Sequence, residues 1–211
     1  LESVETKKIG GIALTLLIGV TGIVFSLPIG IMLALGRTSK LPVLKMLSVI
    51  FIEFIRGVPL IALLFIASTM LNYFLPPGTT FDLLVRVLIM VTFFASAYMA
   101  EVIRGGLAGI PKGQIEAAQA SGLSYWKTTY LIVMPQVLKI SIPGIVNTFI
   151  GLFKDTALVS IVGIFDLLGA AQSTLADAAW STPVQGLTGY LVVAAIFFFF
   201  CFGMSRYSMY M

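Results

Sequence analysis

Histidine is absent from this 211-residue sequence, and cysteine occurs once. Without histidine the chain lacks the commonest nitrogen ligand for metals and the usual general base of Ser-His-Asp and Cys-His sites. A single cysteine excludes a disulfide within the chain, and Cys201 lies in a run of phenylalanines that is typical of an apolar environment. We therefore expect no metal site and no histidine-dependent enzyme.

Charged residues are also scarce, at 10% of the chain against 59% hydrophobic residues, and the mean hydropathy is +1.06. So few polar groups could not cover the surface of a soluble domain. The net charge of +4 is an excess that the loops at one membrane face produce by themselves, so it indicates no nucleic-acid partner. The composition predicts one integral membrane domain over residues 1–211, of the all-α class, surrounded by the lipid bilayer.

About five apolar segments are long enough to cross a bilayer as helices: 9–36, 47–75, 81–103, 137–153 and 186–204. The first lacks a cleavage pattern, so we expect a retained span and not a signal peptide. Gly57 and Pro59 interrupt the second segment and predict a broken helix. Residues 157–164 fit either a re-entrant piece or an extension of the fourth span. The distribution of lysine and arginine predicts an N-terminus outside the cell membrane and a C-terminus in the cytoplasm.

The polar stretch at about 104–136 contains a short predicted helix. Glu116 lies early in it, near the positive end of the helix dipole, and Gly122 favours its end. Ala117 and Ala118 give it a small-residue face that another protein could approach closely. By spacing alone, an ordinary loop between two spans is an equal alternative.

Glu116-Ala117-Ala118, Gly122, Ile132 and Met134-Pro135 together resemble the EAA loop of binding-protein-dependent ABC importers. That pattern is Glu-Ala-Ala, three residues, Gly, nine residues, Ile, any residue and Leu-Pro. Every spacing matches, and methionine in place of leucine keeps volume and apolarity.

This resemblance implies a type I ABC importer permease fold in which the short helix docks on a cytoplasmic ATPase subunit. The residues that it assigns to this coupling are Glu116, Ala117, Ala118, Gly122 and Pro135. The sequence has no Gly-rich loop ending in Gly-Lys-Ser/Thr, so the partner ATPase would bind ATP and Mg²⁺ and this chain would carry no cofactor. Further implied partners are a second permease copy or homologue, most simply in a homodimer, and an extracytoplasmic solute-binding protein.

Residues 51–60 and 154–158 are similar to segments of the polar amino-acid permeases, which serve histidine, glutamine, glutamate, arginine and opines. Val58 and Ala157 depart from this pattern, because hydroxyl residues are common at both positions. The resemblance implies a transport subunit, not an enzyme, that moves polar and more specifically basic amino acids by alternating access.

Charged side chains inside these segments each need a partner or an aqueous cavity, because a charge at membrane depth costs at least about 2.5 kcal/mol. Glu53 and Arg56 are three residues apart on one helix and can pair with each other, whereas the consecutive Lys154 and Asp155 cannot. An amino-acid substrate would offer an ammonium and a carboxylate to such groups. The predicted substrate-binding residues are Glu53 and Asp155 for cationic groups, and Arg56, Lys154, Thr156 and Ser160 for the carboxylate.

Three alternatives remain open from the sequence. The charged residues could lie at the outer surface or in subunit contacts. The chain could be a secondary transporter or channel of another fold, although that would leave the short alanine-rich helix without a purpose. It could also be an intramembrane enzyme that uses Glu53 and Asp155 as paired carboxylates.

Overall fold

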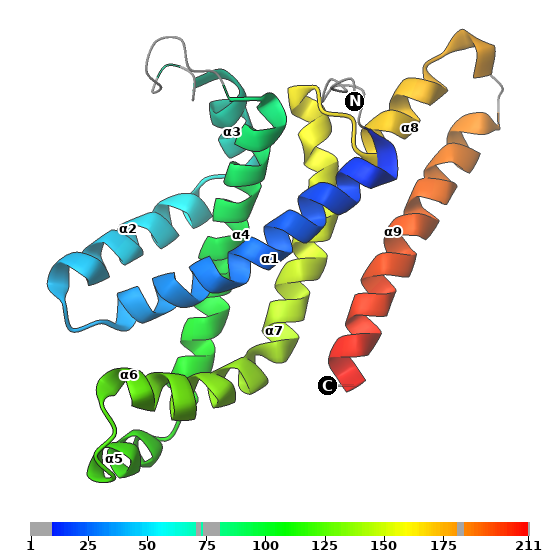
Figure 1. The fold of residues 1–211 in the computed structure, drawn as a ribbon. Helices are drawn as coiled ribbons and strands as arrows, with labels where there is room; N and C mark the ends of the chain where they lie inside the picture. The colour runs from blue at the N-terminus through cyan, green and yellow to red at the C-terminus, as the bar shows by residue number, and fades with distance from the viewer. Residues whose placement is uncertain (1–9, 71–72, 74–80, 181–183, 211) are drawn as a thin grey trace, which may run out of the picture.

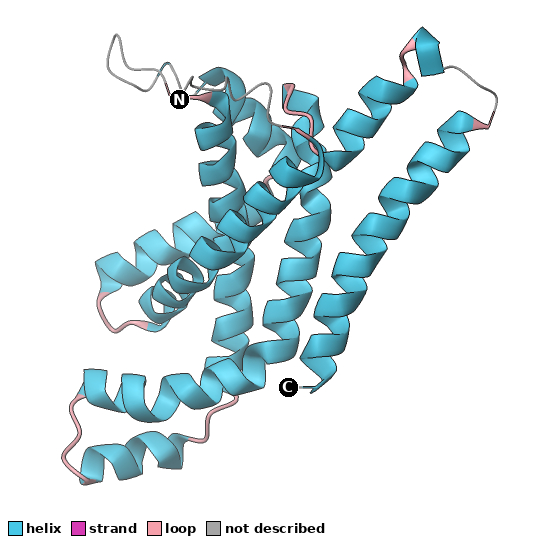
Figure 2. Cartoon of the chain, turned by 45° about the vertical axis from the view of Figure 1, so that its right-hand side comes forward, coloured by secondary structure: helices cyan, strands magenta, loops and turns pink. Residues whose placement is uncertain are grey.

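The computed structural model describes residues 10–70, 73, 81–180 and 184–210, and within these residues the chain is helical with no strand (Figures 1 and 2). The α-helices are α1 (Gly11–Thr38), α2 (Pro42–Gly57), α3 (Leu60–Phe65), α4 (Leu83–Ala108), α5 (Lys112–Ala120), α6 (Tyr125–Thr128), α7 (Met134–Asp155), α8 (Leu167–Leu175) and α9 (Gln185–Tyr210). Two π-helical turns, Ile66–Met70 and Thr129–Val133, follow α3 and α6, and 3-10 turns cover Thr156–Val162 and Ala178–Trp180.

Four helical stretches are long and apolar enough to cross a membrane: α1, α4, the continuous run Tyr125–Val162, and α9. A fifth is the broken pair Pro42–Gly57 and Leu60–Met70, bent by 103°. The break falls at Val58 and Pro59, as predicted, because proline has no N–H for the helical hydrogen bond and disfavours helical backbone in the residue before it.

The fourth span is longer than predicted. Thr156–Val162 continues α7 as a 3-10 helix and ends at Gly163, whose φ is +82°. Only glycine adopts this left-handed backbone without strain, so the chain turns there. Residues 157–162 are therefore an extension of the fourth span and not a re-entrant piece.

Helix α1 crosses α4 diagonally, and glycines in α1 allow the close approach (Figure 1). A Cβ at Gly30 would lie 2.7 Å from the Cβ of Met99, and one at Gly22 would lie 2.8 Å from Cδ2 of Leu152. Around these contacts lie buried side chains from several helices, including Ile18, Val91 and Ile103. Small residues at helix crossings are the usual way in which membrane helices gain van der Waals contact.

Gly30→Val is expected to destabilise the protein by about 1–3 kcal/mol, because the side chain would push α1 away from Met99. The matched control is Gly203→Val in α9, where an added Cβ meets no atom within 4 Å. Both variants carry the same helix-propensity change, so the difference in Tm in detergent isolates the packing effect. Equal Tm values would contradict the proposed role of the crossing.

The start of α8 is tied to the start of α1, 152 residues earlier in the chain. Gly11 N–H donates to the Phe165 carbonyl (3.0 Å), and Leu167 N–H donates to the Thr15 hydroxyl oxygen (2.9 Å). Between them Asp166 is fully buried and caps α8 by accepting from Gly169 N–H at 2.9 Å. Burial raises the pKa of the Asp166 carboxyl above its ordinary value, and the backbone hydrogen bonds offset this only in part.

Asp166→Asn is expected to raise the Tm at pH 7. A carboxyl whose pKa is raised by folding favours the folded state below its unfolded pKa of about 4, and this contribution is lost as pH rises through the folded value. The gain from asparagine should therefore shrink as the pH falls toward 4. The control is Asp177→Asn, an exposed aspartate that caps a turn by accepting from Ala179 N–H. A gain independent of pH would contradict the charge effect.

Candidate functional site

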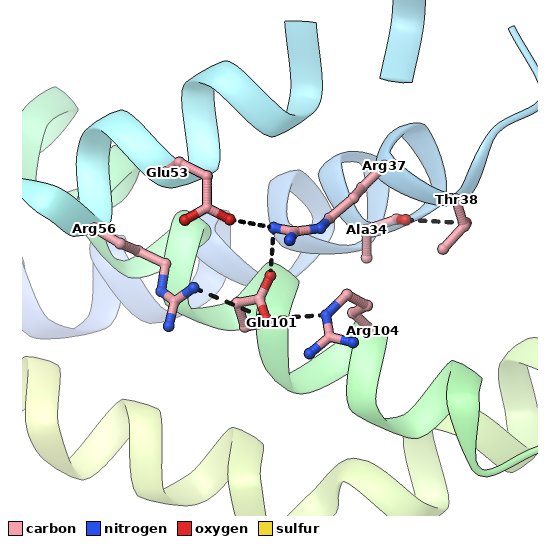
Figure 3. A network of polar contacts seen from close by, with 7 residues as sticks. All are labelled: Ala34, Arg37, Thr38, Glu53, Arg56, Glu101 and Arg104. Carbon is pink, nitrogen blue, oxygen red and sulfur yellow. Dashed lines mark hydrogen bonds and ion pairs between the residues drawn. The ribbon is translucent and has the colours of Figure 1, made fainter. Parts of the chain in front are cut away.

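Three helices bring five charged side chains together at one end of the bundle (Figure 3). Arg37 Nη1, at the end of α1, donates to Glu53 of α2 at 2.8 Å and to Glu101 of α4 at 2.7 Å. Glu101 also accepts from Arg104 Nε at 3.0 Å and lies 3.8 Å from Arg56 Nη1. We call these five residues the arginine–glutamate cluster.

Glu53 and Arg56, whose spacing allows them to pair with each other, do not do so. Each side chain reaches a different helix, Glu53 to Arg37 and Arg56 to Glu101. Glu101 is the centre of the cluster, with a side chain only 18% exposed against 54% for Glu53. Three arginines around it offset its loss of hydration.

Asp155 lies apart from that cluster, in a cavity of about 310 Å³ between α4 and α7. Its polar neighbours in the lining are Tyr98, Asn147 and Thr148, and Phe94 packs on Tyr98 with ring centroids 4.9 Å apart. We call this space the α4–α7 cavity. Its lining combines apolar walls with a few polar groups, which is typical of a small-molecule site.

Tyr98 connects the cavity to the arginine–glutamate cluster. The Arg56 guanidinium carbon lies 5.5 Å from the centre of the Tyr98 ring, a cation–π contact. Tyr98 is one helical turn from Glu101 on α4, so the aromatic ring and the carboxylate share a helix face. Tyr98 therefore contacts the Arg56 guanidinium and also lines the cavity.

The six predicted substrate-binding residues do not form one cluster. Glu53 and Arg56 belong to the arginine–glutamate cluster, and Asp155 lines the α4–α7 cavity. Lys154 is exposed. Thr156 and Ser160 donate their hydroxyl hydrogens to the carbonyls of Phe153 (2.8 Å) and Ala157 (2.9 Å) in their own helix, and neither lines the cavity.

Sequence reasoning missed Tyr98, Asn147 and Thr148 as cavity residues. Asn147 and Thr148 carried a signal, because polar side chains inside an apolar span usually face a cavity or a neighbouring helix. Tyr98 carried none, since a single tyrosine among small residues is equally typical of helix packing.

The short helix predicted in the polar stretch is α5, and it ends as the Gly122 position requires. Gly122 has a φ of +79°, Leu123 N–H donates to the Ala118 carbonyl (3.1 Å), and Gly122 N–H donates to the Gln119 carbonyl (2.9 Å). This pair of bonds is the Schellman arrangement of a helix end. Nothing lies within 4 Å of an added Cβ at Gly122, so backbone conformation, not space, selects glycine.

Helix α5 projects from the ends of α4 and α6, away from the body of the bundle (Figure 2). Glu116 and Ala117 are exposed, whereas Ala118 is buried against the rest of the loop. Pro135 is the second residue of α7 and follows the π-helical turn Thr129–Val133. Because proline has no N–H to donate, the helix register changes at this point.

Comparison with known proteins agrees with this architecture. A family model described as "Binding-protein-dependent transport system inner membrane component" matches residues 26–210. Over its full length the chain is 61% identical to the glutamate/glutamine/aspartate/asparagine transport system permease protein BztC of Rhodobacter capsulatus, covering 48% of that protein. It is 54% identical to the inner membrane amino-acid ABC transporter permease protein YhdY of Escherichia coli, covering 57% of it. The chain thus spans about half the length of these two relatives.

Among solved structures, one described as an amino acid ABC transporter with histidines matches with a TM-score of 0.80 at 27% identity. The match covers 94% of this chain and 89% of that one. A structure of the MetNI methionine ABC transporter shares the fold, with a TM-score of 0.69 at 22% identity, over 93% of this chain and 90% of that one. On the family match and the identity to its relatives, the chain belongs to the family of binding-protein-dependent transport system inner membrane components.

Proposed function

We propose that this chain is the membrane-spanning permease subunit of an ABC importer for polar amino acids. The observation that carries the proposal is α5, a helix with exposed small residues, a glycine-dependent end and every spacing of the EAA pattern. In the proposed assembly two permease chains dock on cytoplasmic ATPase subunits, which bind ATP and Mg²⁺, and a solute-binding protein delivers substrate outside. The N-terminus lies outside the cytoplasm and the C-terminus inside it, so α5 faces the ATPase.

The α4–α7 cavity is the proposed substrate path. Asp155 offers a carboxylate to the ammonium group that every amino acid carries, and Asn147 and Thr148 offer neutral polar groups to the rest of the substrate. Arg56, in contact with the Tyr98 ring, supplies positive potential for the substrate carboxylate. Lys154, Thr156 and Ser160 are the weaker candidates, because none of them lines the cavity.

The choice among polar amino acids is a separate part of the proposal. The sequence resemblance favours basic substrates, whereas the printed name of BztC gives glutamate, glutamine, aspartate and asparagine. The assembled transporter in proteoliposomes should take up one of these two groups in an ATP-dependent manner. Labelled arginine, histidine, glutamate, glutamine, aspartate and asparagine form the panel. Uptake driven by an ion gradient without ATP would favour a secondary transporter instead.

The docking role of α5 is tested by Gly122→Ala. A non-glycine residue in left-handed backbone costs roughly 1–2 kcal/mol, so co-purification with the ATPase and ATP-driven uptake should fall about 5- to 30-fold. The matched control is Gly113→Ala inside α5, a position that also has open space around an added Cβ but no positive φ. Equal association of both variants with the ATPase would contradict the docking role.

A further inference from the structure

A second cavity lies between the ends of α1 and α4, α2, and the helices α5 and α6, and it has a basic lining. Its volume is about 600 Å³, and Arg37, Lys45 and Arg104 line it together with the hydroxyl residues Thr128 and Thr129. In the part of the chain that the structure describes, no carboxylate lines it. We call it the basic cavity.

Positive charge is in excess around the basic cavity. Arg37, Arg56, Arg104 and Lys45 supply four positive charges, whereas Glu53 and Glu101 of the arginine–glutamate cluster supply two negative ones. Lys45 forms no ion pair with any described residue. The bonds to glutamate use Nη1 of Arg37 and Nε of Arg104, and a guanidinium has five N–H donors, so both arginines retain donors for another ligand.

Thr128 lies in the wall of the cavity and is only 3% exposed, and its hydroxyl Oγ1 has no hydrogen-bond partner among the described residues. Because Oγ1 has almost no accessible surface, a ligand in the cavity does not reach it. The basic side chains, and not this hydroxyl, therefore define the site.

The other residues that line the basic cavity favour a lipid over a soluble anion as its ligand. Apolar side chains, among them Leu35, Val49 and Leu107, alternate with the cations. The same α2 helix exposes Leu44 and Leu47 beside Lys45, and α6 presents Tyr125 and Trp126 at the surface. Exposed aromatic residues at the end of a bundle mark the level of lipid headgroups, and basic pockets at that level accept phosphodiesters.

We propose that the basic cavity binds the phosphate of an acidic phospholipid, with Lys45, Arg37 and Arg104 as its ligands and an acyl chain along α2. The inference rests on the proposed function only for the assignment of this site to the cytoplasmic leaflet. Binding of lipid to the purified chain depends neither on transport nor on the ATPase.

In the test, the purified chain in detergent is titrated with phosphatidylglycerol, phosphatidylcholine or inorganic phosphate. Native mass spectrometry measures the bound ligand, and the Tm measures the stabilisation that it causes. Phosphatidylglycerol should bind more tightly than phosphatidylcholine, and Lys45→Gln should weaken it about fivefold, since one lysine near an anionic headgroup contributes roughly that factor. Lys45→Arg should retain binding.

The matched control is Lys139→Gln, which removes an exposed lysine of α7 that does not line the basic cavity. Binding of phosphatidylglycerol to this variant should be unchanged. Equal affinities for the two lipids, or equal losses in the Lys45→Gln and Lys139→Gln variants, would overturn the proposal. Displacement of the lipid by millimolar inorganic phosphate would overturn the lipid assignment in favour of a soluble anion.

Discussion

Asp155→Asn is expected to reduce amino-acid uptake by at least about 30-fold while the ATPase activity of the assembled transporter persists. The carboxylate lines the α4–α7 cavity, and along the proposed substrate path the ammonium of the substrate leaves water to enter this cavity. Removing one partner of a desolvated, hydrogen-bonded charge pair costs about 2–5 kcal/mol, most of it because the other charge is left unpaired. Asparagine keeps the shape of the side chain, so the loss reports charge and not packing.

The measurement is KM and maximal rate for uptake into proteoliposomes at saturating ATP, with ATPase activity recorded in parallel. The loss should fall mainly on KM if the ammonium is bound before translocation. The matched control is Lys154→Gln, which removes the neighbouring charge from an exposed position outside the cavity. Unchanged uptake and unchanged substrate preference in the Asp155 variant would sink the proposed substrate path.

Glu101→Gln is expected to destabilise the folded chain by about 2–3 kcal/mol. The change removes the negative charge that Arg37, Arg56 and Arg104 share, from a side chain that is only 18% exposed. Loss of one partner in a fully buried ion pair costs about 3–5 kcal/mol, and the remaining exposure of Glu101 reduces that figure.

The control for this prediction is Glu53→Gln. Glu53 is more than half exposed and pairs with Arg37 alone, so its loss should cost about 1 kcal/mol or less. Thermal unfolding in detergent measures both variants, and the double change Glu101→Gln with Arg104→Gln should recover part of the stability because it removes one unpaired arginine. Equal Tm values for the two single variants would show that Glu101 is not the centre of the cluster.

The spans illustrate what apolar pattern can predict. Within the described residues each of the five segments is mostly helical, and the break at Val58 and Pro59 divides α2 from α3. These features follow from local chemistry, since lipid forces the backbone to satisfy its hydrogen bonds within each helix and proline prevents this at one point. The length of the fourth span was underestimated because the end of a helix depends on its tertiary contacts as well as on its sequence.

The charged residues illustrate where local pattern fails. The notion that Glu53 and Arg56 pair rested on their three-residue spacing, which is a sound rule for an isolated helix. In the bundle, Arg37 of α1 pairs with Glu53 at a sequence separation of 16 residues, and Glu101 of α4 lies 3.8 Å from Arg56. Arg37 has two carboxylates within reach. Its contacts between helices therefore form in preference to a Glu53–Arg56 pair, whose two flexible side chains would lie at the surface of one helix.

By itself the sequence determined the membrane environment, the five spans, and the family, the last through the spacing of Glu116, Gly122 and Pro135. These are properties of composition and of short segments. Only the tertiary structure decided which charges meet, that Asp155 lines a cavity with Tyr98 and Asn147, and that Thr128 is buried without a partner. The reason is that helices in lipid are uniformly apolar outside, so their rotation and crossing depend on close contacts such as Gly30 against Met99, which no single segment encodes.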